Sequence, residues 1–254
     1  RLDRLAEYAS RQSAILRSAG VRLLITVGRA RPLAEALQGA VPTLEDVVTA
    51  EDLAAGPEEA ARLGPRSRPE DPAFIQYTSG STGSPKGVLL THANLMANVK
   101  AIGQGLDARE SEMGVSWLPL YHDMGLIGFV LAPLAHAVNI TFLPPLLFLK
   151  RPVTWFQAFT RHKGTIAYAP NFAFALCVKR IRERELANID LSTWRVAGCG
   201  AEPIRPETLE AFCDAFGKVG FDPKAMYPSY GMAESSLAIA FTELGPIKGP
   251  SNAA

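Results

Sequence analysis

The spacing of apolar residues changes several times along the first third of the chain, and each change predicts a new structural element. In residues 1–19, apolar side chains recur near the helical period of about 3.6 residues, and Gly20 then supplies a stop signal. Residues 21–27 form an apolar run that predicts a buried strand, and residues 29–37 return to a helical spacing. Residues 41–69 are rich in Ala, Glu, Pro and Gly without a clear period, so we expect a surface connection there.

After residue 70, strand-like and helical segments alternate. The predicted strands are the segment around residue 74 and residues 88–90, 113–118, 139–143, 165–168, 195–197 and 225–227. The predicted helices are residues 94–103, 153–162 and 206–216, the segment after Met124, and the segment from Pro170 to about residue 185. This alternation predicts an α/β fold of layered, largely parallel sheets with flanking helices. Ligands of such folds bind beyond the carboxyl ends of strands, so the segments that follow strands are the candidate sites.

One long segment raises the question of a membrane span. Between residues 125 and 149 the only ionisable side chain is that of His136, and the segment is long enough to cross a bilayer. Pro133, Pro144 and Pro145 interrupt a continuous helix. We therefore expect buried helix, strand and apolar pocket wall in this segment, and no membrane span.

Composition narrows the class of protein further. The chain is 48% hydrophobic and 20% charged, and its net charge is +1 without a long run of one sign. This balance excludes the basic footprint of a nucleic-acid-binding protein and a polybasic membrane anchor. The three cysteines have no CxxC spacing, which argues against a disulfide framework or a zinc site. The first residues do not show the basic and then apolar pattern of a secretory signal peptide. Together these features favour a cytoplasmic protein.

Residues 77–87 read Tyr-Thr-Ser-Gly-Ser-Thr-Gly-Ser-Pro-Lys-Gly and carry the densest chemistry of the chain. Glycines allow close approach of the backbone to an anion, hydroxyl and N–H groups donate hydrogen bonds, and Lys86 adds a positive charge. The segment is not a Walker A loop, because Pro85 stands where that motif requires glycine. A flexible Ser/Gly linker is the alternative, but the position between two predicted strands favours a loop that holds phosphate groups.

Three further segments follow predicted strands. Residues 118–125 contain His122 and Asp123, a pair that is structural in most loops. Residues 196–203 end a strand in small residues, which form either a flat backbone surface for a base or a simple turn into a helix. Residues 227–235 place an aromatic ring, a glycine and a carboxylate within five positions. Each of these segments is ambiguous when taken alone.

Taken together and in this order, the four segments resemble the acyl-adenylate-forming superfamily, which contains acyl-CoA synthetases, luciferases and the adenylation domains of peptide synthetases. The sequence of residues 118–128, 169–173 and 200–203 is most similar to that of the fatty acyl-AMP ligases. Ala233 stands where the wider superfamily often has threonine, and the fatty acyl-AMP ligases share this departure. The resemblance covers residues 1–244 and is weakest before Asp71.

The resemblance implies that a fatty carboxylate attacks the α-phosphate of ATP, giving an acyl-adenylate and pyrophosphate. It implies catalytic roles for His122, Lys86 and Glu234, with Glu234 also as the ligand of Mg²⁺. The residues that it implies for ATP binding are Thr78, Ser79, Gly80, Ser81, Thr82, Gly83, Lys86, Gly200, Ala201, Glu202, Tyr230, Gly231, Met232 and Ala233. The apolar residues 126–148, with Phe172 and Phe174, are the candidate lining of an acyl-chain tunnel.

By the same resemblance, residues 1–244 are part of an N-terminal AMP-binding domain, with residues 1–70 peripheral and residues 71–244 forming the nucleotide and acyl site. Residues 245–254 are a Gly/Pro-rich end that suggests truncation, because the family's ribose-binding aspartate, hinge and small C-terminal domain are missing. We expect weak activity from this piece alone. The expected partners are a fatty acid and an acyl carrier protein or a polyketide synthase carrier domain. The alternatives are a long-chain acyl-CoA synthetase and a non-catalytic module that binds nucleotides or acyl groups.

Overall fold

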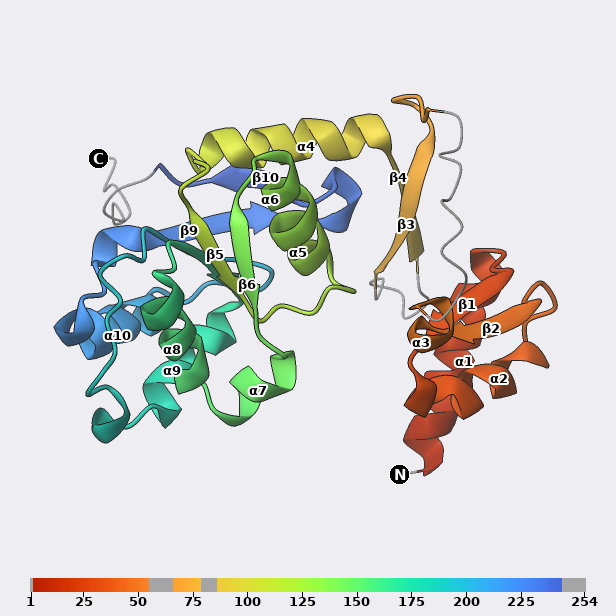
Figure 1. The fold of residues 1–254 in the computed structure, drawn as a ribbon, viewed down its shortest axis with the longest axis horizontal. Helices are drawn as coiled ribbons and strands as arrows, with labels where there is room; N and C mark the ends of the chain where they lie inside the picture. The colour runs from red at the N-terminus through yellow and green to blue at the C-terminus, as the bar shows by residue number, and fades with distance from the viewer. Residues whose placement is uncertain (1, 55–65, 79–85, 244–254) are drawn as a thin grey trace, which may run out of the picture. The chain divides into compact units, whose positions relative to one another are not determined.

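The computed structural model describes residues 2–54, 66–78 and 86–243 and divides the chain into two compact units, Arg1–His92 and Ala93–Ala254 (Figure 1). The predicted α/β class is confirmed, since strands and helices alternate in both units. Within the described ranges, no helix has both the length and the apolar character needed to cross a membrane.

The first unit begins with a small α/β layer. Its elements are α1 (Leu2–Ser18), β1 (Leu23–Thr26), the 3₁₀ turn η1 (Gly28–Ala30), α2 (Arg31–Gln38), β2 (Asp46–Thr49) and α3 (Ala50–Ala54). Strands β1 and β2 pair in parallel, with Leu24 opposite Val47. Leu16, Leu37 and Val41 are buried beneath this pair, so the predicted helices at residues 1–19 and 29–37 are confirmed.

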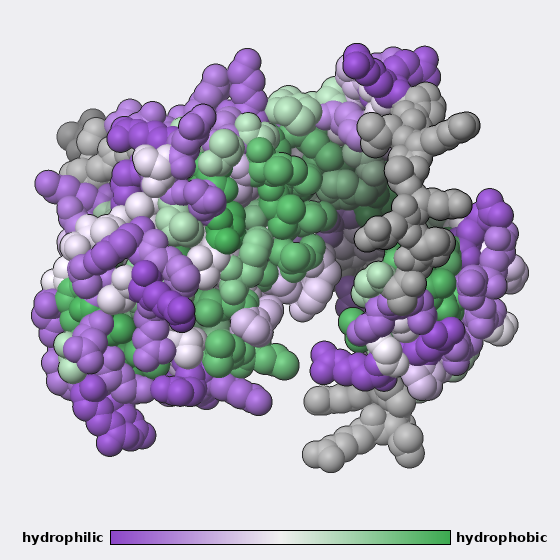
Figure 2. Space-filling view, in the orientation of Figure 1, coloured by the Kyte–Doolittle hydropathy of each residue, from purple (hydrophilic) through white to green (hydrophobic). Residues whose placement is uncertain are grey.

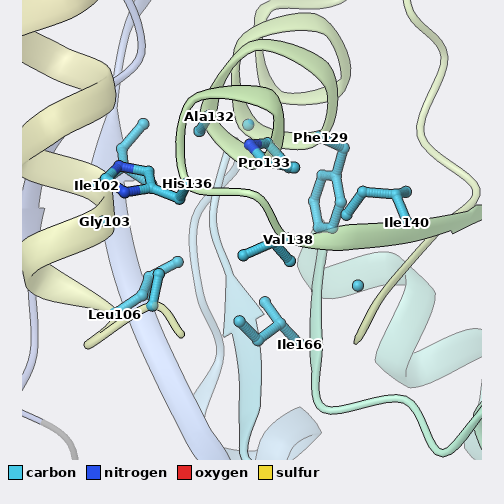
Figure 3. A pocket seen from close by; sticks show the side chains of 13 residues that line it. Ile102, Gly103, Leu106, Phe129, Ala132, Pro133, His136, Val138, Ile140 and Ile166 are labelled. Carbon is cyan, nitrogen blue, oxygen red and sulfur yellow. The ribbon is translucent and has the colours of Figure 1, made fainter. Parts of the chain in front are cut away.

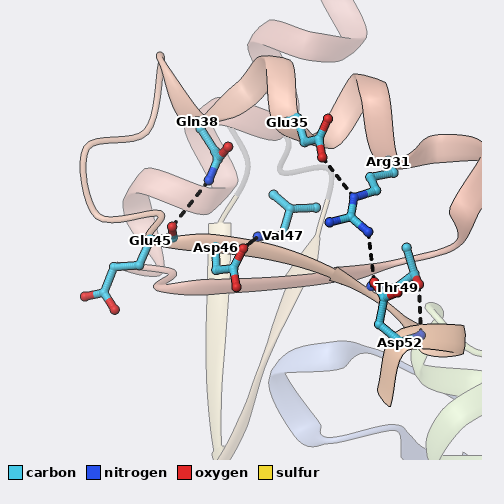
Figure 4. Close-up of polar contacts among 8 residues, drawn as sticks. All are labelled: Arg31, Glu35, Gln38, Glu45, Asp46, Val47, Thr49 and Asp52. Atoms are coloured by element: carbon cyan, nitrogen blue, oxygen red, sulfur yellow. Dashed lines mark hydrogen bonds and ion pairs between the residues drawn. The ribbon is translucent and has the colours of Figure 1, made fainter. Parts of the chain in front are cut away.

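The surface connection expected over residues 41–69 is wrong in its first part, because β2 and α3 lie there. Thr49 and Asp52 start α3 by a reciprocal bond: the Thr49 N–H donates to Asp52 Oδ2 at 2.9 Å, and the Asp52 N–H donates to Thr49 Oγ1 at 3.1 Å (Figure 4). Arg31 donates to the same Asp52 carboxylate at 2.9 Å. Short elements held by such polar pairs leave no apolar period in the sequence.

The strand predicted over residues 21–27 exists but is not buried on both faces. Leu24 packs against the core of the first unit, whereas Leu23 and Ile25 are exposed, Ile25 by 56%. Alternate side chains of a strand point to opposite faces, and helices cover only the face that carries Leu24. A run of apolar residues therefore does not by itself show burial on both sides.

The first unit also contains an antiparallel hairpin, β3 (Pro72–Thr78) and β4 (Lys86–Thr91). Gly87 lies opposite Tyr77, and a Cβ atom at Gly87 would come within 3.0 Å of the Tyr77 ring and 2.8 Å of Ile75. Only glycine fits this position without displacing Ile75. Residues 79–85, which connect the two strands in the sequence, lie outside the described residues.

The second unit is built on a six-stranded sheet in the order β10-β9-β8-β7-β5-β6. Its strands are β5 (Met113–Ser116), β6 (Asn139–Phe142), β7 (Ile166–Ala169), β8 (Val196–Cys199), β9 (Met226–Gly231) and β10 (Ala238–Phe241). All neighbours are parallel except β9 and β10. Helices α8 (Val153–His162), α9 (Asn171–Arg180) and α10 (Pro206–Phe216) cover one side of the sheet, and α4 (His92–Gly105) lies on the other (Figure 1).

The predicted helices of this unit are confirmed, but their ends differ in places. Residues 153–162 and 206–216 are helical as predicted. Helix α9 stops at Arg180 instead of continuing to residue 185, because Ile181 is extended, with φ of −76° and ψ of 122°. Strand β9 is longer than predicted, and neither β10 nor the helix α7 (Pro145–Lys150) was predicted. Both missed elements are short and lack a period that sequence alone reveals.

Pro133 does not interrupt the helical segment after Met124, contrary to expectation. The helix runs through α5 (Asp123–Leu126), the π-helical turn η2 (Ile127–Leu131) and α6 (Ala132–Ala135). In the π turn the Ala132 N–H donates to the Ile127 carbonyl, five residues back. The π turn ends directly before α6, and Pro133 stands at the start of α6, where its missing N–H costs least.

Part of the segment expected to be buried is exposed. Leu134, Phe142 and Leu146 show large exposed fractions, and apolar side chains cover the surface around α5, α6 and α7 (Figure 2). Strand β6 is at the edge of the sheet, and Phe148 is the buried residue by which α7 is anchored. An edge strand and a short helix bury only one side each, so half of their apolar residues face outwards.

Aromatic rings fill the space between the sheet and α8, α9 and α10. Trp194 stacks on Phe159 at 3.9 Å between ring centroids and meets Trp155 edge-on at 4.9 Å. Phe156 meets Phe216 edge-on at 4.7 Å. All five rings are almost completely buried. Close-packed cores of this kind resist small displacements, so the strands above them form a rigid base for the loops at their ends.

Candidate functional site

Three of the four predicted site segments follow parallel strands of the second unit, β5, β8 and β9. His122 comes after β5, residues 200–202 come after β8, and residues 230–234 lie at the end of β9 and just beyond it. Strands β5, β7, β8 and β9 run in the same direction, so these segments emerge at one edge of the sheet. The structure therefore brings together the predicted site residues of the second unit at the place where α/β folds bind ligands.

His122 caps the first turn of α5 and interacts with Asp123. Its Nδ1 lies 2.6 Å from Asp123 Oδ1 and 3.2 Å from the Met124 nitrogen. The Asp123 carboxylate also accepts the Met124 N–H, at 2.6 Å. A protonated ring donates Nδ1–H to Asp123, whereas a neutral ring can accept the Met124 N–H instead. Asp123, the less certain member of the predicted pair, thus orients the imidazole.

The same contact changes the acidity of His122. The hydrogen bond with the Asp123 carboxylate, reinforced by its charge, raises the pKa of His122 above its usual value, and partial burial of the ring opposes this. The side chain is half exposed. The imidazolium therefore persists to a higher pH than in an isolated histidine, which suits a group that meets negatively charged ligands.

The turn after β8 presents backbone at the edge of the sheet. The Gly200 N–H donates to the Ala169 carbonyl at 3.3 Å and continues the ladder between β7 and β8. A Cβ atom at Gly200 would lie 3.0 Å from the Ser229 carbonyl oxygen, so glycine keeps this turn close to β9. Ala201 is exposed and takes the left-handed conformation, with φ of 68°. Gly200 and Ala201 therefore present backbone close to β9, with Gly200 held by its bond to β7.

Tyr230 and Glu234 lie on the adjacent strand and turn. Tyr230 is 62% exposed, which leaves its ring available to stack on a ligand. Gly231 has no room for a side chain, because a Cβ atom would lie 2.0 Å from the Leu237 carbonyl oxygen. Ala233 is buried, and Glu234 is exposed in the 3₁₀ turn η6 (Ala233–Ser235). The Glu234 carboxylate therefore lies in a turn whose preceding residues, Gly231 and Ala233, are closely packed.

Asn98 supports this region from α4. Its carboxamide nitrogen donates to the Ala238 carbonyl at 2.8 Å, and its oxygen accepts the Ala238 N–H at 2.9 Å. Ala238 is the β10 partner of Gly231. The side chain of Asn98 thus pairs with β10 much as a neighbouring strand would.

The fourth segment belongs to the first unit. Thr78 and Lys86 face each other across the hairpin, and the Lys86 side chain is exposed. Directly opposed residues of an antiparallel pair point to the same face. Five predicted phosphate-binding residues of the loop lie outside the described residues: Ser79, Gly80, Ser81, Thr82 and Gly83.

The described carboxylates suit a magnesium ion only if the ligand supplies most of its coordination. No group of three or more His, Cys, Asp or Glu side chains that could hold a metal occurs in the described part of the chain. Mg²⁺ commonly binds through one or two carboxylates together with substrate phosphates. A single exposed carboxylate, Glu234, fits that arrangement and does not fit a cage made of protein alone.

Sequence reasoning missed two polar residues under the turn after β8. The Tyr168 hydroxyl lies 3.3 Å from Ser229 Oγ, and burial raises the pKa of Tyr168. The Tyr168 ring fills the space left by Gly198, whose Cβ atom would lie 2.2 Å from it. The strand period indicates that these residues are in strands, but only the fold brings together positions so far apart in sequence.

An apolar pocket lies on the side of the sheet that carries α4. It holds about 360 Å³ of atom-free space, partly open to solvent (Figure 3). Residues of the predicted tunnel segment that line it are Gly128, Phe129, Ala132, Pro133, His136, Val138 and Ile140. Phe129 also meets Tyr168 edge-on, with 6.4 Å between ring centroids. Phe174, predicted for the same tunnel, is fully buried in the aromatic core instead.

Comparison with known proteins gives a consistent result. The sequence model of the AMP-binding enzyme family matches residues 7–253. A relative from Caulobacter vibrioides, described as a putative acyl-CoA synthetase, is 48% identical over 194 residues, which cover 76% of this chain and 34% of that protein. The medium-chain-fatty-acid–(acyl-carrier-protein) ligase TtuA of Teredinibacter turnerae is 43% identical over 178 residues, which cover 70% of this chain and 28% of that protein.

The fold has close counterparts among solved structures. A crystal structure of the fatty acyl-adenylate ligase from L. pneumophila in complex with acyl adenylate and pyrophosphate matches 93% of this chain with a TM-score of 0.82 and 35% sequence identity. The chain covers 41% of that structure. It thus spans about a third of the length of the curated relatives and somewhat more of the solved structure.

Proposed function

Because the chain belongs to the AMP-binding enzyme family, we propose that it forms the nucleotide and acyl site of a longer enzyme, here called the full-length ligase, which activates a fatty acid with ATP. The observation that carries the proposal is the convergence of His122, the turn at residues 200–202 and Tyr230 with Glu234 at one edge of a parallel sheet. The similarity to a fatty acyl-adenylate ligase with bound acyl adenylate and pyrophosphate supports it.

In the proposed reaction, a carboxylate oxygen attacks the α-phosphorus of ATP. A new P–O bond joins the acyl group to AMP, and the bond to the pyrophosphate oxygen breaks, so the leaving group carries away its electron pair. Such transfers depend on alignment and on neutralising charge in the transition state. The protein supplies cations and N–H donors for this purpose, and the proposal includes no covalent intermediate with the enzyme.

Each described site residue has a role in this proposal. Tyr230 would stack on the adenine, opposite the backbone of Gly200 and Ala201. His122, as an imidazolium held by Asp123, would donate to the oxygen atoms where the carboxylate meets the α-phosphate. Glu234 would hold Mg²⁺, which when bound neutralises the phosphate charge. Lys86 and Thr78 would contact the β- and γ-phosphates together with the loop between them.

The acyl acceptor distinguishes two versions of the enzyme. The relative from Teredinibacter transfers to an acyl carrier protein according to its name, whereas the relative from Caulobacter is described as a putative acyl-CoA synthetase. The motif sequences, which resemble those of fatty acyl-AMP ligases, favour a carrier protein as the acyl acceptor. The test supplies the full-length ligase with ATP, dodecanoic acid and either a phosphopantetheinylated carrier protein or free CoA. We expect the carrier protein to become acylated. Rapid formation of acyl-CoA would favour the synthetase instead.

Replacing Lys86 by alanine is expected to reduce ATP–pyrophosphate exchange by about 100-fold, because the leaving pyrophosphate loses a charge-assisted hydrogen bond. Lys86 is exposed at the end of a hairpin strand, so the fold should be unaffected. Lys100→Ala, on the exposed face of α4, is the matched control. Equal exchange rates in the two variants would remove Lys86 from the mechanism.

The pH dependence of the reaction is expected to report on His122. The Asp123 carboxylate raises the pKa of His122, so the active imidazolium is present at low pH and is lost as the pH rises through this raised pKa. In Asp123→Asn the pKa of His122 should fall, and the basic limb of the profile of kcat/KM should move to lower pH. A basic limb that does not move in this variant would show that another group titrates.

A further inference from the structure

Two side chains connect the turn after β8 with the start of α9, and they do so reciprocally. Glu202, in the turn, accepts the Phe172 N–H of α9 at its Oε1, at 2.6 Å. Asn171, the first residue of α9, accepts the Arg205 N–H at the far end of the turn at its Oδ1, at 3.0 Å. Each element thus supplies an acceptor to a backbone N–H of the other. The turn at residues 200–205 is therefore tied to α9 at Glu202, directly after Ala201, and at its last residue, Arg205.

The chemistry of both bonds favours a fixed geometry. Asn171 is 7% exposed, and its carboxamide nitrogen lies 3.5 Å from Thr208 Oγ1 in α10. A buried amide left without a hydrogen-bond partner destabilises the fold. Movement of Arg205 away from Asn171 would therefore cost free energy. Glu202 is exposed, but its carboxylate meets one of the first N–H groups of a ten-residue helix, which lack partners inside the helix and favour negative charge.

The first turn of α9 also contacts the segment that leads to His122. The Phe172 ring meets the Trp117 ring edge-on, with 6.1 Å between centroids. Trp117 is buried and stacks on Phe148 at 4.0 Å. Trp117 follows β5 directly, five residues before His122. The start of α9 therefore lies between the turn after β8 and the loop that carries His122, and it contacts both.

We infer that Asn171 and Glu202 are positioning residues, which hold the backbone of Gly200 and Ala201 where the adenine of ATP binds; the inference rests on the proposed function. The Glu202 carboxylate is engaged by α9, so Glu202 acts on the nucleotide through the turn and not through a contact of its own side chain. This assignment differs from the direct ATP contact that the sequence motif predicts for Glu202.

The inference is tested in the full-length ligase with Glu202→Ala and Glu202→Gln. Loss of the acceptor in Glu202→Ala is expected to raise the KM for ATP by about fivefold to tenfold, with a smaller change in kcat. Glutamine keeps an oxygen that can accept the Phe172 N–H, so Glu202→Gln should recover most of the affinity. Glu207→Ala, another exposed carboxylate at a helix start, is the matched control and should leave the KM unchanged.

A change of nucleotide separates positioning from direct contact. Purine riboside triphosphate lacks the N6 amino group of ATP. A carboxylate beside the adenine would accept a hydrogen bond from this group. If Glu202 positions the turn, Glu202→Ala weakens the use of ATP and of the analogue by the same factor. If Glu202 binds the amino group, the variant weakens the use of ATP only, and this result would overturn the inference, as would a KM equal to that of the wild type.

Binding of AMP, measured by titration calorimetry, keeps this test independent of turnover. Weaker AMP binding by Glu202→Ala than by wild type is expected even if no fatty acid supports exchange, an outcome that would contradict only the proposed function. Equal AMP affinities with normal exchange would overturn only the role of Glu202. Asn171→Asp retains the Oδ1 acceptor and should bind AMP like wild type. Asn171→Ala loses this acceptor and should bind AMP more weakly, measured at a temperature at which both variants are folded.

Discussion

Replacing Glu234 by glutamine is expected to reduce ATP–pyrophosphate exchange by about 100- to 1,000-fold, the range found when one group that stabilises transition-state charge is removed. Glutamine has nearly the same shape as glutamate, so the loss reports on the negative charge that would hold Mg²⁺ against the phosphates. Glu234 is exposed in the turn η6, and its replacement leaves the packing unchanged. The measurement is the exchange rate at saturating ATP and dodecanoic acid.

The control for this prediction is Glu210→Gln, which removes an exposed carboxylate of α10. It should retain the wild-type rate. Raising the magnesium concentration should restore part of the activity of Glu234→Gln, because a weakened site fills at higher ion concentration. If Glu234→Gln exchanges as fast as Glu210→Gln, the carboxylate has no part in the reaction.

Replacing Gly231 by alanine is expected to abolish exchange and to lower the free energy of unfolding by about 3 kcal/mol, an overpacking effect. The new Cβ atom would lie 2.0 Å from the Leu237 carbonyl oxygen. That carbonyl cannot move freely, since it accepts the Met232 N–H at 2.9 Å and the next residue, Ala238, is held by Asn98. The backbone between Tyr230 and Glu234 must therefore shift, and both side chains leave their positions.

The matched substitution is Gly217→Ala, at a glycine whose added Cβ atom would have no neighbour within 4 Å. Chemical denaturation and exchange are measured on both variants. We expect Gly217→Ala to match the wild type in both. A Gly231→Ala protein with wild-type stability and activity would show that the turn after β9 tolerates movement, contrary to the rigid geometry described above.

Elements with a clear apolar period were predictable from the sequence. Helices α8 and α10 have the predicted limits because their apolar faces are continuous and proline precedes or begins each of them. Strand β10 and helix α3 were missed. Strand β10 is held by a partner far away in the sequence, Asn98 of α4, and such a partner leaves no local pattern.

The candidate site residues come from sequence motifs, whereas the residues that contact and support them come from the fold. His122, Tyr230 and Glu234 stand in recognisable sequences. Asn171 and Tyr168 act on segments 34 and 61 residues away, respectively, and their partners are known only from the fold. The steric reason for Gly231 likewise depends on a carbonyl six residues further along the chain. These supporting contacts could therefore not be predicted from the sequence alone.

We propose that this chain provides the site where a fatty acid is joined to AMP. The most direct test incubates the full-length ligase with dodecanoic acid and ATP labelled at the α-phosphate, without any acyl acceptor, and separates the products by chromatography. We expect labelled dodecanoyl-AMP in wild type and only traces of it in Glu234→Gln. Labelled AMP or ADP without dodecanoyl-AMP, for every fatty acid supplied, would show that the chain does not provide this site.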